Sequence, residues 1–177
     1  MSTIFCTPNG QGSREWRVVM VMNLLIGCVT VFITMGIQIA AVVYLLQYLF
    51  KVMSRTDNRN RSKGRTTYVI SMMMTMLFVG HLVQVAVWAL LFIQVGEFTD
   101  YATAFYHSMV NFSSLGYGDI VMSENRRLLG AIEASTGVLM FGLSAGAMLS
   151  IMSFLLTRNG LFKDQLDEVE RHHQDQR

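Results

Sequence analysis

The sequence predicts an all-helical membrane protein with three membrane-spanning helices. Of the 177 residues, 52% are hydrophobic and only 15% are charged, whereas a soluble domain carries about 25% charged residues. Residues 18–50, 66–96 and 134–157 contain no Asp, Glu, Lys or Arg at all. Each run exceeds the roughly 20 apolar residues that a helix needs to cross a bilayer. These runs argue against a soluble enzyme domain. A net charge of +2 without a nucleic-acid motif argues against nucleic-acid binding.

The first run, residues 18–50, is expected to be a retained membrane helix that follows an N-terminal segment, residues 1–17. Its 33 residues are too many for the apolar core of a secretory signal. As a helix they reach about 50 Å, against a hydrocarbon core of about 30 Å. We expect either a tilted helix or a helix whose end, from Tyr44 to Phe50, continues into the interface, where aromatic side chains are common.

A basic connector, residues 51–66, sets the expected orientation. It contains the bases Lys51, Arg55, Arg59, Arg61, Lys63 and Arg65 and the single acid Asp57. Short basic loops tend to be cytoplasmic, so the N-terminus and the segment after the second span are expected outside and the C-terminus inside. Anionic lipid headgroups are the expected partners of this loop, in preference to nucleic acid.

The segment between the second and third runs is too short to span but carries the most unusual pattern. Residues 101–112 suit a short amphipathic helix, with Thr99 or Asp100 as its N-cap. Gly116-Tyr117-Gly118 follows, and two glycines around an aromatic residue make a poor helix. Non-helical backbone at membrane depth is tolerated only where it is buried in protein or lines a water-filled path. This pattern is typical of a re-entrant pore loop.

Residues 114–119, Ser-Leu-Gly-Tyr-Gly-Asp, resemble the selectivity filter of the potassium-channel superfamily, whose pattern is Thr-Val-Gly-Tyr-Gly-Asp. An outer helix (67–95), a pore helix (101–112) and a glycine-containing inner helix (128–157) surround it in the family's order. The resemblance covers residues 67–157, about half of the chain. It implies the pore domain of a small bacterial-type channel with one pore loop per chain, assembled as a homotetramer, here with one extra N-terminal transmembrane helix.

The residue types suit that role for physical reasons. A dehydrated cation needs rings of oxygen in place of water, and backbone carbonyls from several chains supply them. Turning successive carbonyls to one axis requires alternating backbone handedness, which Gly116 and Gly118 accept without a Cβ penalty. Tyr117 is expected to point away from the axis and pack on the pore helix. The expected filter is Ser114, Leu115, Gly116, Tyr117 and Gly118, with K+ bound at Ser114, Leu115, Gly116 and Tyr117.

Asp119 follows the filter and is expected to attract cations to the outer mouth, with a simple turn carboxylate as the alternative. Ser114 replaces the family's threonine, which keeps the hydroxyl and loses the stiff β-branch. Leu115 replaces valine at a position that contributes only its backbone. Many relatives carry an acid in the pore helix, where this chain has Ser108-Met109-Val110. A non-selective cation channel, or a non-conducting scaffold or transporter subunit, therefore remains as an alternative to potassium selectivity.

The inner helix contains one acid and several glycines. Glu133 stands in an otherwise apolar stretch, and an ionisable group in a span is costly and is usually functional or paired. We expect it to tie the inner helix to the back of the pore loop, with a plain interfacial residue and then a proton sensor as alternatives. Gly142 and Gly146 form a GxxxG pair that favours close packing, whereas the position of Gly137 favours the hinge of an inner gate.

The tail, residues 158–177, places Phe162, Leu166, Val169 and His173 on one helix face, which suits a short cytoplasmic bundle or an interfacial helix. His172 and His173 would bind a metal only with partners that the sequence does not show. The sequence contains no nucleophile–base pair and no phosphate-binding loop, so we expect neither an enzyme nor an enzyme substrate. We expect that the protein needs no cofactor and that K+ is the permeant ion. The family resemblance favours a cell membrane, in particular a bacterial inner membrane.

Overall fold

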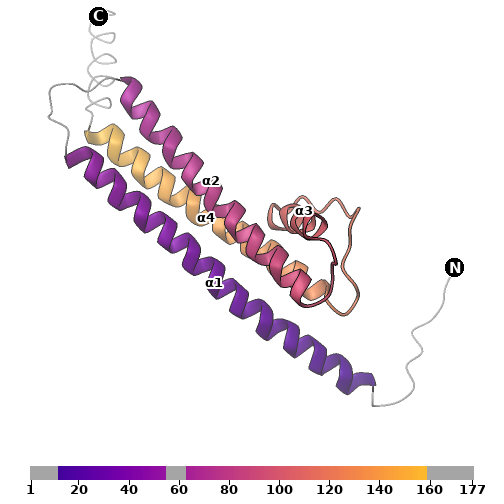
Figure 1. Cartoon of the computed structure of the whole chain (residues 1–177). Coiled ribbons are helices and arrows are strands. Elements are labelled where there is room, and N and C mark those ends of the chain that lie inside the picture. The colour runs from indigo at the N-terminus through magenta and orange to yellow at the C-terminus, as the bar shows by residue number, and fades with distance from the viewer. Residues whose placement is uncertain (1–11, 55–62, 159–177) are drawn as a thin grey trace, which may run out of the picture. The chain divides into compact units, whose positions relative to one another are not determined.

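The computed structural model describes residues 12–54 and 63–158, and within these ranges the chain forms four helices and no strand (Figure 1). They are α1 (Gly12–Ser54), α2 (Lys63–Gln94), α3 (Tyr101–Phe112) and α4 (Arg127–Arg158). The expected all-helical fold is confirmed.

Three of these helices are long and apolar enough to cross a bilayer. The spanning segments are Trp16–Lys51 in α1, Thr67–Gln94 in α2 and Arg127–Phe154 in α4. The short α3 has the range expected for the pore helix. The chain is therefore a multi-pass membrane protein. Most of the basic connector and the tail with His172 and His173 lie outside the described residues.

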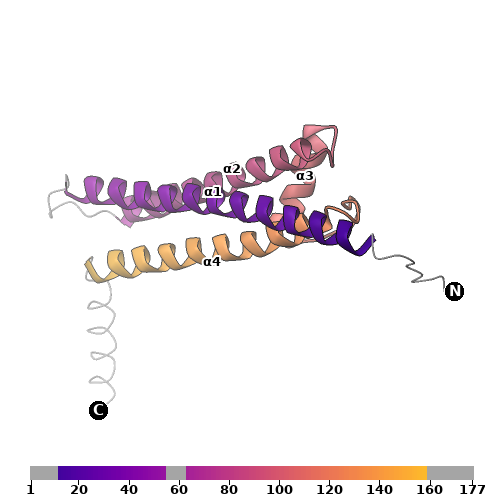
Figure 2. The same cartoon turned by 90° about the horizontal axis from the view of Figure 1, so that it is seen from below.

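The chain divides into two units, which are described separately. The first comprises residues 1–38 and 81–140 and contains α3. Figures 1 and 2 agree that α3 lies beside the end of α2 and the start of α4. The core of this unit consists of Val85, Trp88, Phe92, Phe112, Leu129 and Met140. These side chains attach α3 to α2 and α4, and so they position the segment that follows α3.

The second unit comprises residues 39–80 and 141–177. Its core consists of Leu45, Leu49, Met73, Leu77 and Ile151, contributed by α1, α2 and α4. The rings of Phe50 and Phe154 add a contact with their centroids 6.3 Å apart. This unit is held by apolar packing, and it contains none of the expected filter residues.

Within the first unit, the buried face of α1 is polar or small. It consists of Asn23, Gly27, Thr30, Thr34 and Gln38, spaced three or four residues apart. Such residues let membrane helices approach closely and hydrogen-bond to one another. Gln84 of α2 donates a hydrogen bond to Gln38, and both side chains are fully buried. The large apolar side chains of α1, such as Phe32, which is 74% exposed, face away from the protein.

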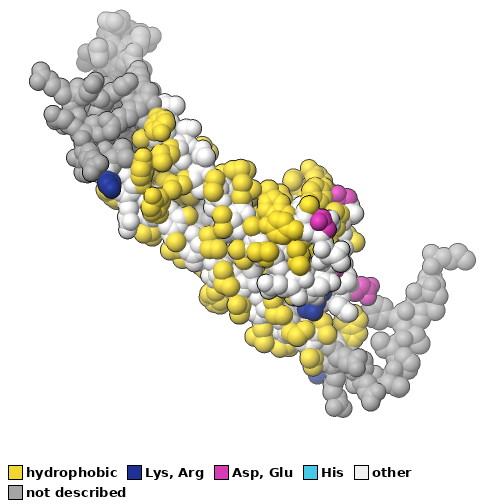
Figure 3. All heavy atoms as spheres, in the orientation of Figure 1, with side chains coloured by type: hydrophobic (Ala, Val, Ile, Leu, Met, Phe, Trp, Pro, Cys, Tyr) yellow, Lys and Arg dark blue, Asp and Glu magenta, His cyan; other side chains and the backbone are white. Residues whose placement is uncertain are grey.

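Hydrophobic side chains cover most of the described surface in the space-filling view, whereas acidic groups gather near α3 and the loop after it (Figure 3). A bilayer around the helices would accommodate this surface, because lipid tails are as apolar as the exposed side chains.

Candidate functional site

The α3 helix begins at a well-formed cap. Asp100 is the N-cap residue, and its carboxylate accepts hydrogen bonds from the amide of Thr103, at 2.9 Å, and from the Thr103 hydroxyl. The Thr103 amide holds the pKa of Asp100 below its usual value. Of the two residues expected as caps, Asp100 therefore takes that place, and it satisfies a free amide of the first turn.

The backbone after α3 alternates in handedness. Ser114, Gly116 and Gly118 have φ values of 59°, 57° and 75°, whereas Leu115 and Tyr117 between them do not have positive φ. Glycine accepts this conformation freely, but for Ser114 it costs roughly 1–2 kcal/mol. An alternation of this kind is the backbone geometry that turns successive carbonyls toward one side of a strand.

The same segment is uncovered in the single chain. All residues from Ser114 to Asp119 are exposed, and Tyr117 is 66% exposed. The start of the segment is held to α3, because the amide of Leu115 donates to the carbonyl of Val110 at 3.0 Å. About a third of the Tyr117 surface is covered within the described chain, so the packing expected for this ring is not complete there.

Asp119, directly after the glycines, is held by a residue of α3. The phenol of Tyr106 donates a hydrogen bond to Asp119 at 2.7 Å. This bond lowers the pKa of Asp119 and raises that of Tyr106, because it favours the charged carboxylate and the neutral phenol. At neutral pH the end of the segment therefore carries a negative charge.

His107 connects α3 to the residue after Asp119. Its Nδ1 lies 3.0 Å from the carbonyl oxygen of Ile120, and its Nε2 lies 2.9 Å from Nδ2 of Asn111. Because a carbonyl can only accept, Nδ1 carries the proton, and Nε2 then accepts from the Asn111 amide. The ring also packs between Phe92 and Phe98, with centroids 5.7 and 5.0 Å away. His107 therefore has a packing role and in addition supports the loop.

Two further side chains hold the rest of this loop. Glu97, between α2 and α3, accepts hydrogen bonds from the amide and the hydroxyl of Ser123. Asn23 of α1 donates to the carbonyl of Asn125 and accepts from Arg126. The loop between the glycine segment and α4 is therefore supported from several elements that are distant in sequence.

Glu133 lies on α4 behind α3, and its side chain is fully buried. The hydroxyl of Ser108 donates a hydrogen bond to its carboxylate and also lies 3.0 Å from the carbonyl oxygen of Val85. The α3 helix thus offers a hydroxyl at this contact, and α4 supplies the acid.

The glycines of α4 differ in how closely the rest of the described chain approaches them. A Cβ at position 137 would stand 1.9 Å from the carbonyl oxygen of Phe112, so this glycine is required for close packing on the end of α3. The same atom at position 142 or 146 would meet nothing of the described chain within 4 Å. Close packing on α3 therefore occurs at Gly137 within the described chain, and the packing expected at Gly142 and Gly146 stays a prediction. At Gly130, a Cβ would come 3.0 Å from the side chain of Asn111.

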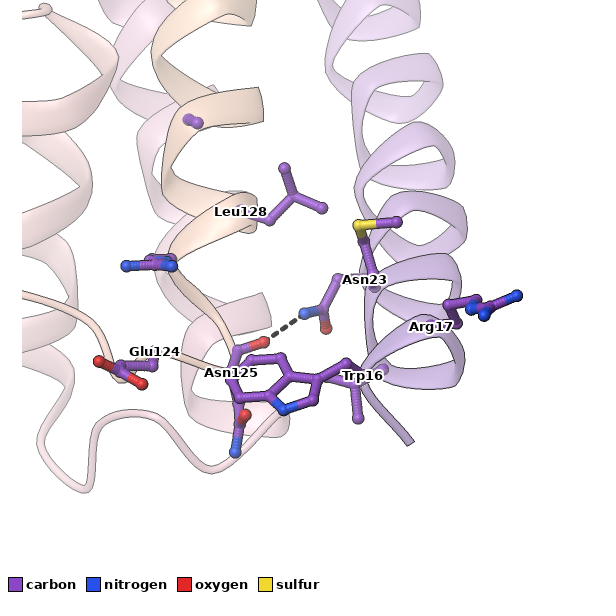
Figure 4. A pocket seen from close by; sticks show the side chains of 10 residues that line it. Trp16, Arg17, Asn23, Glu124, Asn125 and Leu128 are labelled. Atoms are coloured by element: carbon purple, nitrogen blue, oxygen red, sulfur yellow. Dashed lines mark hydrogen bonds between the residues drawn. The ribbon is translucent and has the colours of Figure 1, made fainter. Parts of the chain in front are cut away.

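A cavity of about 510 Å³ lies at the start of α1 and α4. Figure 4 shows Trp16 and Asn23 of α1 facing Asn125 and Leu128 across it, whereas Arg17 points away. No group of three or more His, Cys, Asp or Glu side chains that could hold a metal ion occurs in the described part of the chain.

A short helix followed by a glycine-bent segment, set between two spanning helices, defines a pore-loop membrane protein. Residues 72–154 match the model of a family described as "Ion channel". The match supports a pore-loop protein of the potassium-channel type, and the predicted resemblance to that superfamily is thereby confirmed. The family points to transport and not to catalysis. No curated protein and no solved structure matches the chain significantly.

Several supporting residues were not identified from the sequence. Tyr106, Glu97 and Asn23 are ordinary polar residues in their local sequence. The partners of Glu97 and Asn23 lie 26 and 102 or more positions away. Only the fold brings these side chains to the loop after the glycine segment, so no local pattern indicates them.

Proposed function

We propose that four copies of the chain form a potassium-selective channel through which K+ passes passively. The observation that carries this proposal is the alternation of left-handed backbone at Ser114, Gly116 and Gly118. Carbonyls turned to one side of a strand replace the hydration shell of an ion when several strands surround it. The K+ ions would be bound at Ser114, Leu115, Gly116 and Tyr117, with the Ser114 hydroxyl completing the inner end.

The need for several chains follows from the geometry of a ring, and the resemblance to the potassium-channel superfamily implies four. One strand offers oxygens from one side only, so a closed cage needs further copies related by rotation. The exposure of the whole segment from Ser114 to Asp119 supports this, because partner chains would cover it. Tyr117 would then complete its packing against a neighbouring pore helix.

The charge at the end of the filter supports cation transport. Asp119 keeps its negative charge through the bond from Tyr106, and a carboxylate at a pore mouth raises the local concentration of cations. By the positive-inside tendency this mouth is extracellular or periplasmic, and the basic connector lies at the cytoplasmic face beside anionic lipids.

One observation favours a less selective channel of the same fold. Ser114 adopts a left-handed conformation without a glycine's freedom or a threonine's stiffness. A filter that stores strain at its inner end would hold its oxygens less rigidly, and Na+ would then pass more easily.

Reversal potentials in a planar bilayer test the proposal. Purified protein is placed between a potassium solution and a sodium solution, and a reversal close to the potassium equilibrium potential is expected. Gly116→Ala should abolish this selectivity, because a Cβ is strained at φ 57°. Gly36→Ala is the matched control, because Gly36 lies in α1 with no positive φ and with open space around it.

The remaining outcomes separate the alternatives. A reversal near zero with sizeable current identifies a non-selective cation channel. The absence of current from correctly assembled protein identifies a non-conducting scaffold, and this result would contradict the proposal.

A further inference from the structure

Side chains from three elements hold the loop between the filter and α4. Tyr106 and His107 come from α3 and contact the first two residues of the loop, Asp119 and Ile120. Glu97 from the connector before α3 holds Ser123 in its middle. The last residues of the loop, Asn125 and Arg126, contact Asn23 of α1. The helix outside the matched ion-channel segment therefore supplies the contact at the far end of the loop.

Asn23 uses both ends of its side-chain amide for this contact. Its Nδ2 donates to the carbonyl oxygen of Asn125, and its Oδ1 accepts from Nη1 of Arg126 at 2.8 Å. The residue is 1% exposed, and Figure 4 shows its side chain reaching from α1 toward Asn125. Two partners that are neighbours in the loop thus share one buried amide. Replacing that amide with an apolar group removes the hydrogen bonds to both the Asn125 carbonyl and the Arg126 side chain.

The position of Asn23 is determined by the contacts of α1 along the same face. One turn further on, a Cβ at Gly27 would stand 2.7 Å from the side chain of Ile132 in α4. Beyond it, Gln38 receives the hydrogen bond from Gln84 of α2. These contacts set both the rotation of α1 and its position along its axis. They bring Asn23 level with the start of α4.

We propose that α1 stabilises the loop after the filter through Asn23, and that this contact prolongs the conducting state of the channel. Asn23 is a positioning residue in this account, because it acts on the filter through Asn125 and Arg126. The part that concerns conduction rests on the proposed function, whereas the restraint of the loop does not. A loop held at both ends passes less motion to Asp119 and the filter than a loop held at one end.

Amide hydrogen exchange of the full-length protein tests the restraint directly. The informative amides are those of Arg126 and Arg127, which donate to the carbonyl of Ser123. In Asn23→Leu they should exchange about tenfold faster or more, since two hydrogen bonds of the loop are lost. Asn23→Asp, which keeps an acceptor for Arg126 but no donor for Asn125, should give an intermediate rate.

Thr34→Val is the matched control. Thr34 is fully buried on the same face of α1, but its hydroxyl donates to carbonyls of its own helix, at Thr30 and Val31. This substitution perturbs the buried face without touching the loop, so exchange at Arg126 and Arg127 should stay at the wild-type rate. Equal acceleration in Asn23→Leu and Thr34→Val would overturn the proposal.

Single-channel recording tests the consequence for conduction. The conducting bursts of Asn23→Leu should be severalfold shorter than those of the wild type. Raising K+ on the filter side should restore them, because a bound ion favours the state that binds it. A merely structural defect would reduce the number of channels and leave this potassium dependence unchanged. Faster exchange with unaltered bursts would overturn the link to the filter.

The experiments distinguish a failure of the proposed function from a failure of the restraint by Asn23. If the wild-type protein passes no current, the channel proposal is wrong, and hydrogen exchange still decides whether Asn23 restrains the loop. If Asn23→Leu does not assemble, Asn23→Asp gives the same comparison, since it preserves the size of the side chain.

Discussion

Gly137 of α4 and Phe112 of α3 approach so closely that a Cβ on the glycine would stand 1.9 Å from the phenylalanine carbonyl oxygen. Phe112 is the last residue of α3, two positions before Ser114. The α4 helix therefore presses directly on the backbone that leads into the proposed filter. A displacement of α4 at this point would be transmitted to the filter by contact.

Gly137→Ala should consequently disturb the filter. Relieving the overlap requires backbone to move, and forced changes of this kind in a packed region cost about 1–3 kcal/mol or more. We expect a lower unfolding temperature in detergent and a loss of potassium selectivity. Gly36→Ala, with open space around the new methyl group, should retain both properties. Wild-type selectivity in Gly137→Ala would show that the two helices separate without affecting the filter.

Ser108→Ala tests the contact between α3 and α4. The substitution removes the hydroxyl that donates to the buried Glu133 carboxylate. Loss of such a partner costs about 1–3 kcal/mol, which should appear as reduced thermal stability. Glu133→Leu combined with Ser108→Ala should recover part of the loss, because the buried carboxyl group is then removed together with the hydroxyl that it contacts. Additive losses in the double variant would contradict a direct interaction.

Tyr106→Phe should make conduction more sensitive to acid on the filter side. The Tyr106 phenol lowers the pKa of Asp119, so the carboxylate stays charged to a lower pH than usual. Without the phenol this pKa rises toward its ordinary value. Current should then decline at a higher pH on acidification than in the wild type. The measurement is current against filter-side pH, with Tyr101→Phe as a control elsewhere on α3. Identical pH profiles for all three proteins would show that Asp119 does not contribute to attracting cations.

The buried pair Gln38 and Gln84 should behave as a unit. Gln38→Leu alone leaves the amide of Gln84 without the acceptor it now uses, at a cost of about 1–3 kcal/mol. Replacing both residues by leucine should cost less than the sum of the single changes. Thermal unfolding of the four proteins gives the coupling, and a coupling near zero would mean that α1 is held by its other contacts.

The sequence was sufficient for the spans and for the left-handed backbone at the two glycines. Three charge-free runs indicated three spanning helices, and Gly116 and Gly118 indicated where left-handed backbone was needed. The left-handed Ser114 could not be anticipated, because a non-glycine residue is held there only by its surroundings. The close contact at Gly137 could not be predicted either, since a glycine in a helix is compatible both with a hinge and with a point of close approach.

The buried face of α1 was a different case. Hydrophobicity places apolar residues inside a soluble protein, but lipid is as apolar as a protein core. The face that turns inward in the first unit is marked by Asn23, Thr30, Thr34 and Gln38, which are the less apolar residues of the helix. Asn23 and Gln38 contact residues outside α1, so the sequence of α1 alone does not show their partners. The hydroxyls of Thr30 and Thr34 donate to carbonyls of their own helix.

The uncovered segment from Ser114 to Asp119 has a genetic consequence in the proposed tetramer. Each chain contributes one side of a shared cage, so a copy with a damaged filter would spoil the assemblies that it enters. Substitutions there should be dominant when mutant and normal chains are produced together. A substitution that prevents a chain from assembling should be recessive, because the normal copies would then combine only with one another.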